Sequence, residues 1–187
     1  HSDSSHRDEL LALTRWKSSE NEGWLSLDDY VEAMPEGQEA IYYLAGPNAL
    51  ALRNSPHLEA LRADGYNALL MTDAVDEWVI QSIPSYKDKP FKSASQGALE
   101  VGGDEGEASE SPIDPLLAKA RALLGDRVKD VRASSRLKSS ASCLVDDAAG
   151  LSRNMERILR MAQQQVASHK RILELNPDHA FVKKANA

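Results

Sequence analysis

The clearest structural signals in this chain lie in the stretch SPHLEALRADGYNALLMTDAVDEW, residues 55–78. Ser55 can cap a helix, Pro56 suits the first helical position because its φ angle is already set, and Gly65 supplies a left-handed stop. After this short helix, residues 68–71 form an unbroken apolar run between polar neighbours. Such a run predicts a strand that is covered on both faces.

A second helix is expected to begin after Asp73, which serves as its N-cap. Asp76 falls in the first turn, where a negative charge interacts favourably with the helix dipole. Four residues recur at the spacing of one helix face: Val75, Trp78, Val79 and Ser82. Val75 and Val79 are expected to supply the buried face.

The flanking segments extend this order of strands and helices. Residues 40–44 and 91–93 are expected to be strands. Helical patterns cover residues 9–17 and 26–35 and a short stretch through Leu50 and Leu52. A repeated strand–helix order favours a parallel sheet with helices on both faces. The first half therefore predicts the α/β class, as a small three-layer parallel-sheet subdomain.

The second half of the chain has a different pattern. Residues 112–124 predict a helix with one apolar side, which Gly125 ends. Three later segments have the composition or alternation of strands: residues 128–132, 142–145 and 171–175. A helix is expected between the last two, at residues 152–166. This half is expected to form an α+β domain.

These patterns divide the chain into residues 1–96, a linker at 97–111, and residues 112–187. The linker region is rich in Gly and Ser, lacks aromatic residues, and holds five acids and no base: Glu100, Asp104, Glu105, Glu107 and Glu110. The other 24 of the 29 acidic residues face 22 basic ones, so the two domains taken together are close to neutral. A stretch with so little to bury is expected to be flexible.

The composition excludes several classes of function. A formal net charge of −7 argues against a nucleic-acid surface, because phosphate binding needs clustered Lys and Arg. The single Cys excludes an internal disulfide bond. No apolar run approaches the ~20 residues that span a bilayer. We therefore expect a soluble, cytoplasmic chain that contacts neither nucleic acid nor membrane.

Seven segments resemble those of one protein family, in the order that the family has them: residues 27–31, 36–38, 41–43, 76–78, 89–91, 154–158 and 173–179. The family is that of the ninety-kilodalton heat-shock protein chaperones, in its bacterial HtpG type. The resemblance covers nearly the whole chain. The acidic stretch near Gly102 and the first seven residues match no segment of the family.

The resemblance implies a fragment that holds the end of the middle domain and part of the C-terminal domain. The parent would be a homodimeric, ATP-dependent stress chaperone that binds unfolded or partly folded client proteins, with co-chaperones as further candidate partners. ATP and Mg²⁺ would bind in domains that lie outside this sequence. The fragment itself is expected to be no enzyme, to bind no cofactor and no metal, and to be monomeric, because the last dimerisation helices are not matched.

The resemblance places candidate client-binding residues on two helices. On the first, Glu77 and Trp78 belong to the segment that faces clients in the family, and Gln81 lies one turn further along. An exposed aromatic side chain beside an acid would hold partly unfolded chains. The alternative is that Trp78 is a core residue, since Trp buries more apolar area than any other side chain.

The second helix, at residues 152–166, carries a continuous apolar stripe: Leu151, Met155, Ile158, Leu159, Ala162 and Val166. An amphipathic helix in a small domain normally packs on its sheet. The resemblance implies instead that Leu151, Met155, Ile158 and Leu159 are shared with clients. Met155 suits this use because its unbranched, polarizable side chain adapts to many partners. Both interpretations stay open at this point.

Catalytic and metal-binding patterns are missing from the sequence. It has no Gly-rich phosphate loop and no pair of His residues spaced for zinc. Cys143 has no base beside it and is interpreted as a buried structural thiol, although the resemblance makes it a candidate modification or relay point. The alternative function is a stand-alone small-molecule-binding protein or enzyme that uses the crevice at the carboxyl ends of the strands.

Overall fold

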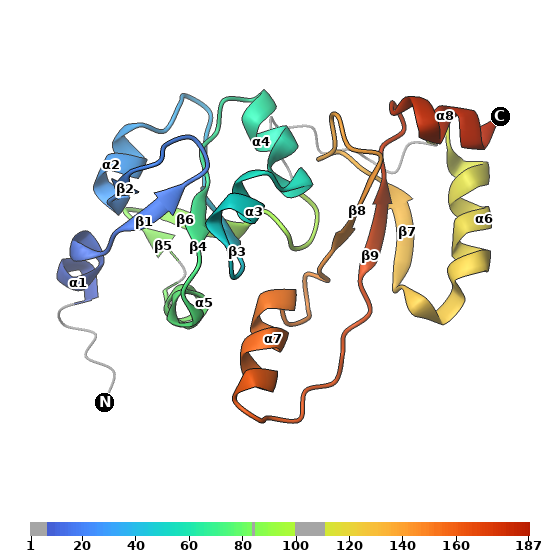
Figure 1. The fold of residues 1–187 in the computed structure, drawn as a ribbon. Helices are drawn as coiled ribbons and strands as arrows, with labels where there is room; N and C mark the ends of the chain where they lie inside the picture. The colour runs from blue at the N-terminus through green and yellow to red at the C-terminus, as the bar shows by residue number, and fades with distance from the viewer. Residues whose placement is uncertain (1–6, 84, 100–110) are drawn as a thin grey trace. The chain divides into compact units, whose positions relative to one another are not determined.

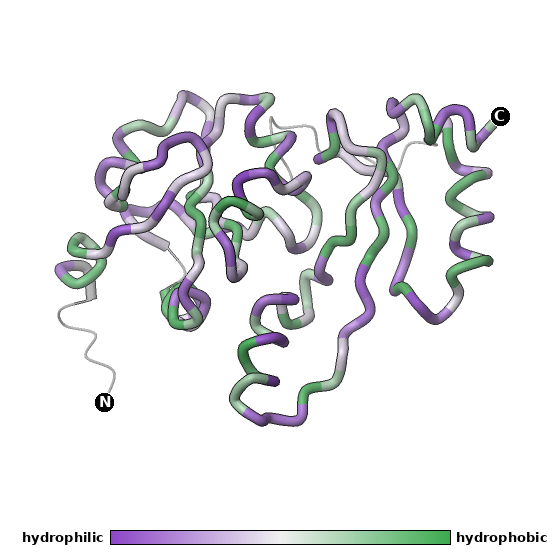
Figure 2. The backbone as a smooth tube through the Cα atoms, viewed as in Figure 1, coloured by the Kyte–Doolittle hydropathy of each residue, from purple (hydrophilic) through white to green (hydrophobic). Residues whose placement is uncertain are grey.

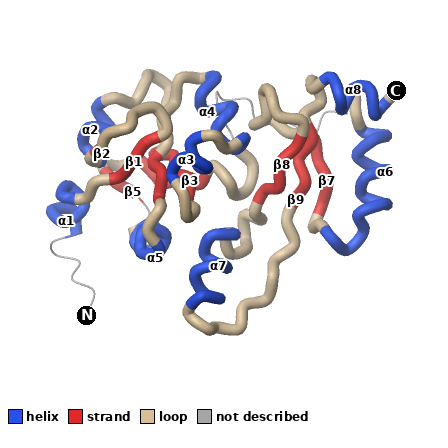
Figure 3. The backbone as a smooth tube through the Cα atoms, viewed as in Figure 1, coloured by secondary structure: helices blue, strands red, loops and turns tan. Residues whose placement is uncertain are grey.

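The computed structural model describes residues 7–83, 85–99 and 111–187, whose helices and strands are drawn in Figure 1 and coloured by type in Figure 3. Most of the acidic segment that was expected to be a linker lies outside the described residues. Its flexibility therefore stays a prediction.

The contacts of the chain divide it into two compact units. The first unit contains the chain up to Asn54 together with Gly65–Ala94. The second contains Ser55–Asp64 together with the chain from Ser95 onward. The chain thus enters the second unit at Ser55, returns to the first at Gly65, and crosses again after Ala94.

The first unit is built on a six-stranded sheet with the order β2-β1-β4-β3-β6-β5. Its strands are β1 (Trp16–Ser18), β2 (Trp24–Leu25), β3 (Ile41–Ala45), β4 (Leu69–Met71), β5 (Ser85–Tyr86) and β6 (Lys89–Ser93). As the order of strands and helices predicted, β3 pairs in parallel with β4 and β6. The pairings β1·β2, β1·β4 and β5·β6 are antiparallel. The mixed α and β class is confirmed, and the sheet is parallel only at its centre.

The helices of this unit are α1 (Arg7–Leu13), α2 (Leu27–Glu32), α3 (Ala49–Arg53) and α5 (Ala74–Ser82). Of these, α2, α3 and α5 begin after the capping residues Ser26, Asn48 and Asp73. Before α2, the amide of Asp29 donates to the Ser26 hydroxyl at 3.0 Å, and the Ser26 amide donates to the Asp29 carboxylate at 3.3 Å. Two amides without an intrahelical partner are thereby satisfied reciprocally.

The N-terminal helix is shorter than its sequence pattern indicated. We expected a helix over residues 9–17, but α1 ends at Leu13 and strand β1 starts at Trp16. Trp16 is buried and pairs with Leu25 of β2. Sheet pairing and burial of the indole ring therefore outweigh the helical rhythm of the preceding leucines.

A hairpin that the sequence did not indicate joins β5 to β6. Its two connecting residues, Lys87 and Asp88, have φ angles of 45° and 62°. Left-handed backbone at both positions of a two-residue loop matches the twist of the strands, and the usual signal for it is Asn-Gly. This loop has Lys-Asp in place of Asn-Gly, so the sequence did not indicate the hairpin.

The Tyr30 hydroxyl connects helix, strand and loop within the core of the first unit. It donates to the Asn67 carbonyl at 2.7 Å and accepts from the Tyr42 amide at 3.1 Å. The Gln38 side chain donates to the same oxygen at 3.0 Å. Burial raises the pKa of Tyr30 to about 12, so the hydroxyl stays protonated and can make all three bonds.

The second unit contains a three-stranded sheet with the order β7-β9-β8. Its strands are β7 (Asp130–Ala133), β8 (Ser142–Val145) and β9 (Ile172–Leu175). The α-helices of this unit are α4 (Glu59–Ala63), α6 (Asp114–Leu124), α7 (Arg153–Met161) and α8 (Ala180–Asn186), and its short 3₁₀ helices are η1 (Pro56–Leu58) and η2 (Gly125–Arg127). All three predicted strands are therefore confirmed. The central strand β9 is parallel to β7 and antiparallel to β8.

The two faces of this sheet bury different groups. On one face, Leu173 and Leu175 pack against a cluster that includes Leu117 of α6. Figure 2 shows hydrophobic and hydrophilic positions alternating along α6, as expected of a helix with one buried side. On the other face, Ile172 packs in a second apolar cluster, and the next residue with the same orientation is the buried acid Glu174.

The Glu174 carboxylate is the centre of a buried ionic network. It accepts hydrogen bonds from Arg136 at 2.8 Å, from Arg132 at 2.6 Å and from the Ser134 hydroxyl at 2.7 Å. Burial alone would raise the pKa of Glu174, but Arg136, Ser134 and Arg132 together hold it below its ordinary value. Both arginines also donate to the Gly97 carbonyl, which ties the start of the expected linker to the sheet.

Helix α7 ends earlier than the predicted range of residues 152–166. Gln163 has a φ of 59°, its amide donates to the Arg160 carbonyl, and the Gln164 amide donates to the Leu159 carbonyl, each at 3.0 Å. This pair of bonds is a Schellman motif, the usual closure around a left-handed residue. Ala162 and Val166 therefore do not continue the helical stripe.

Asp88→Gly should stabilise the first unit by about 0.5–1 kcal/mol, because glycine adopts the left-handed conformation without a steric cost. Urea unfolding followed by circular dichroism measures the change. The control is Ala33→Gly, also in the first unit, at a φ of −87°, where the gain should be absent. Equal effects at the two positions would contradict the assigned turn geometry.

Arg136→Met should destabilise the second unit by about 3–5 kcal/mol, because it removes a partner from the buried Glu174 charge. The matched control, Lys183→Met, breaks an ion pair with Asp178 whose two side chains are exposed. That change should cost less than about 1 kcal/mol. Both values come from chemical denaturation; similar losses for the two variants would show that Glu174 does not depend on Arg136.

Candidate functional site

Helix α5 holds the first set of expected binding residues, and its start is fixed firmly. The Asp73 amide donates to the Asp76 carboxylate at 3.0 Å. The indole N–H of Trp16, on β1, donates to the same carboxylate at 3.3 Å. Asp76 and Trp16 both lie within the first unit, and Trp16 belongs to β1, so this bond ties the first turn of α5 directly to the sheet.

The exposed side of α5 differs from the side that the sequence indicated. Val75 was expected to be buried, but it is 60% exposed, and Ile80 is buried in its place. Trp78 is 48% exposed one turn after Val75, so the two side chains are neighbours on one surface. Gln81 is also exposed and follows Trp78 by three residues. An apolar pair with a polar neighbour therefore faces solvent.

Glu77 does not belong to that exposed surface. Its side chain is buried, and it lies close enough to Tyr43 of β3 to affect the pKa of the phenol. Burial first, and the charge of Glu77 second, raise the pKa of Tyr43. The structure thus brings Trp78 and Gln81 together at the surface and turns Glu77 toward the sheet.

Helix α7, in the second unit, holds the second set of expected residues and is anchored by two carboxylates. Asp146 accepts from the Arg153 amide at 2.9 Å, at the start of the helix. Glu156, within the helix, accepts from the His169 amide at 2.9 Å. Arg171 donates to both acids, to Asp146 at 2.9 Å and to Glu156 at 3.0 Å. One guanidinium therefore fixes α7 to the segment that leads into β9.

The burial of the α7 stripe is uneven. Met155, which was expected to meet clients, is 1% exposed. The other three expected residues, Leu151, Ile158 and Leu159, are half-buried. Met161, at the end of the helix, is 73% exposed and was not among the expected residues. It lies three residues after Ile158, and this spacing was the available sequence signal for it.

Cys143 lies in the second apolar cluster, close to the Glu174 carboxylate. Burial, and then the negative charge of Glu174, raise the pKa of its thiol to about 12. The thiol is thus held in its neutral form, which is the unreactive one. These surroundings suit a structural thiol, and modification at Cys143 stays a prediction.

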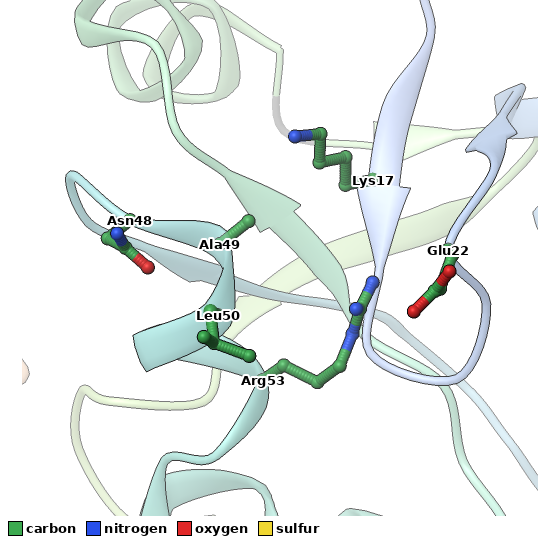
Figure 4. A pocket seen from close by; sticks show the side chains of 6 residues that line it. All are labelled: Lys17, Glu22, Asn48, Ala49, Leu50 and Arg53. Atoms are coloured by element: carbon green, nitrogen blue, oxygen red, sulfur yellow. The ribbon is translucent and has the colours of Figure 1, made fainter.

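The first unit also contains a polar hollow of 440 Å³, shown in Figure 4. It is lined by Lys17, Glu22, Asn48, Ala49, Leu50 and Arg53. Figure 4 shows the Arg53 side chain extending from α3 toward the loop that carries Glu22. The Arg53 guanidinium donates to the carbonyls of Ser18 at 3.1 Å and Asn21 at 2.9 Å. The lining includes neither a His nor a Cys.

The described residues contain neither a metal-binding cluster nor a membrane-spanning helix. Among residues 7–83, 85–99 and 111–187, no cluster of three or more His, Cys, Asp or Glu side chains could hold a metal ion. In the same part of the chain, no helix has the length and apolar character needed to cross a membrane.

Comparison with known proteins gives the family. The family model described as Hsp90 protein matches residues 1–187. The chaperone protein HtpG of Geobacter sulfurreducens is 46% identical over 192 residues, which cover 97% of this chain and 30% of the relative. HtpG of Streptomyces coelicolor is 42% identical, over 98% of this chain and 30% of the relative. The chain belongs to the HtpG/Hsp90 family of chaperones and spans about 30% of the length of these relatives.

Proposed function

We propose that this chain is a client-holding part of an ATP-dependent HtpG-type chaperone. Unfolded or partly folded proteins would bind to apolar side chains on α5 and α7, while ATP and Mg²⁺ would bind in parts of the parent protein beyond these residues. The relatives carry the name chaperone protein HtpG, which supports the class of function. Dimerisation of the parent and binding of co-chaperones belong to the same proposal.

The exposed pair Val75 and Trp78 carries the proposal. Val75 is 60% and Trp78 48% exposed, although the sheet beside α5 offers a well-packed core. Exposed aromatic groups on a rigid support bind apolar segments with little loss of conformational freedom. The bonds at Asp73, Asp76 and Trp16 supply that rigid support.

The residues proposed from the sequence take two different roles. Trp78 and Gln81 on α5, and the half-buried Leu151, Ile158 and Leu159 around α7, would touch clients. Glu77 and Met155 are buried residues of these two helices and would hold them against their units. We add Met161 to the contact set, because a flexible, exposed thioether side chain adapts to partners of varied shape.

Trp78→Ala should weaken the binding of a permanently unfolded model protein by about fivefold or more, with a change in unfolding free energy below about 1 kcal/mol. Fluorescence anisotropy of the labelled model protein gives the affinity, and urea unfolding gives the stability. The matched control is Trp24→Ala, which removes another exposed indole, 66% accessible, from β2. It should leave the affinity unchanged.

On α7, Met155→Ala should lower stability, in contrast to Trp78→Ala. As the truncation of a buried side chain, it should destabilise the second unit by about 2–5 kcal/mol. If Trp78→Ala behaved in the same way and left the affinity intact, Trp78 would be an ordinary core residue and the proposed surface would be wrong.

This chain alone should bind no ATP. Titration calorimetry with Mg²⁺ and ATP at concentrations up to about 1 mM should give no saturable heat. The sequence has no Gly-rich phosphate loop between a strand and a helix N-terminus, which is the reason for this expectation. Saturable binding would place part of the nucleotide site within these residues.

A further inference from the structure

The Glu59 carboxylate, at the start of α4, is held by three consecutive residues of a turn before β8. It accepts from the backbone amides of Lys138 at 2.6 Å, Ser139 at 2.7 Å and Ser140 at 3.1 Å. The hydroxyls of Ser139 and Ser140 donate to the same carboxylate. Five donors from one short turn thus converge on a single side chain, and all of these residues belong to the second unit.

This arrangement has the chemistry of an anion receptor. Successive backbone amides that point into one concavity bind anions, and hydrogen bonds to an ionised acceptor are stronger than those between neutral groups. Burial acts against the charged form of Glu59, but the bonds from Ser140, Ser139 and Lys138 outweigh it and lower the pKa to about 2. The turn therefore stabilises a carboxylate in its ionised state.

The path of the chain gives this contact an importance beyond local stability. Glu59 belongs to Ser55–Asp64, a segment grouped with the second unit although the residues on both sides of it, Asn54 and Gly65, belong to the first. Within the segment, Leu58 and Leu61 are fully buried. A contact that holds this segment in the second unit also restrains the two places where the chain passes between the units, Asn54–Ser55 and Asp64–Gly65.

We propose that the turn Lys138–Ser140 is a carboxylate-binding site, occupied by Glu59 of the same chain, and that the pair is a releasable latch for Ser55–Asp64. The bonds from the Lys138 and Ser139 amides lie in an exposed environment, so water or another carboxylate can replace Glu59. The Glu174 network has no such access, since Glu174 and Arg136 are both buried. The proposal does not depend on client binding by α5 or α7.

Amide hydrogen exchange of this chain tests the latch. Glu59→Gln should speed exchange at Lys138, Ser139 and Ser140 by about tenfold or more, because the charged acceptor is lost. Amides of β9, such as that of Leu173, should exchange at the parental rate. The matched control is Glu39→Gln, which changes an exposed glutamate of the first unit. Exchange within twofold of the parent at all three turn amides would disprove the latch.

Chemical rescue tests the carboxylate site itself. In Glu59→Ala, about 0.1 M acetate should slow exchange at the three turn amides several-fold, and chloride at the same ionic strength should not. Equal effects of the two salts would mean that the turn has no preference for carboxylates. If the alanine variant does not fold, Ser139→Ala with Ser140→Ala retains Glu59 and the backbone donors. This pair should give faster exchange at the turn than the parent, and unchanged exchange would count against the proposal.

Discussion

The second unit depends on satisfying one charge that has no access to water, that of Glu174. Two guanidinium groups and a hydroxyl reach it from β7 and the turn that follows, so the carboxylate determines where Arg132, Ser134 and Arg136 must lie. A buried charge without such partners would cost several kcal/mol. The same requirement recurs at Glu156, where Arg171 and His169 satisfy a buried acid and thereby fix α7. Buried acids, in addition to apolar packing, thus hold the elements of this unit in place.

Local sequence signals predicted those parts of the fold that depend on local chemistry. Ser26, Asp73 and Gly65 lie at the helix ends for which their side chains or backbone freedom suit them, and the runs that became β3, β4 and β9 were identified from apolar character and alternation. The strand at Trp16 was missed because its pairing with Leu25 cannot be read from either segment alone. The Schellman closure at Gln163 was missed because Gln is an unusual residue in left-handed backbone.

The candidate site was less predictable than the fold, because exposure depends on which way a helix is rotated on its support. The spacing of Val75, Trp78 and Val79 correctly indicated a helix, but it could not tell which face the sheet would cover. The buried position of Glu77 is set by its orientation toward β3, which a single sequence does not reveal. Family resemblance named Trp78, which is 48% exposed, and it passed over Met161, which the end of α7 leaves exposed.

The membership of Ser55–Asp64 in the second unit has a consequence for the order of synthesis. The donors that hold Glu59 are 79 to 81 residues further along the chain, so a ribosome releases this segment long before its turn exists. The residues of the first unit are complete once Ala94 has emerged, while Leu58 and Leu61 still lack much of the unit to which they belong. The bonds to Glu59 can therefore form only after all residues of the first unit have been synthesised, which makes this contact a late step in the folding of the chain.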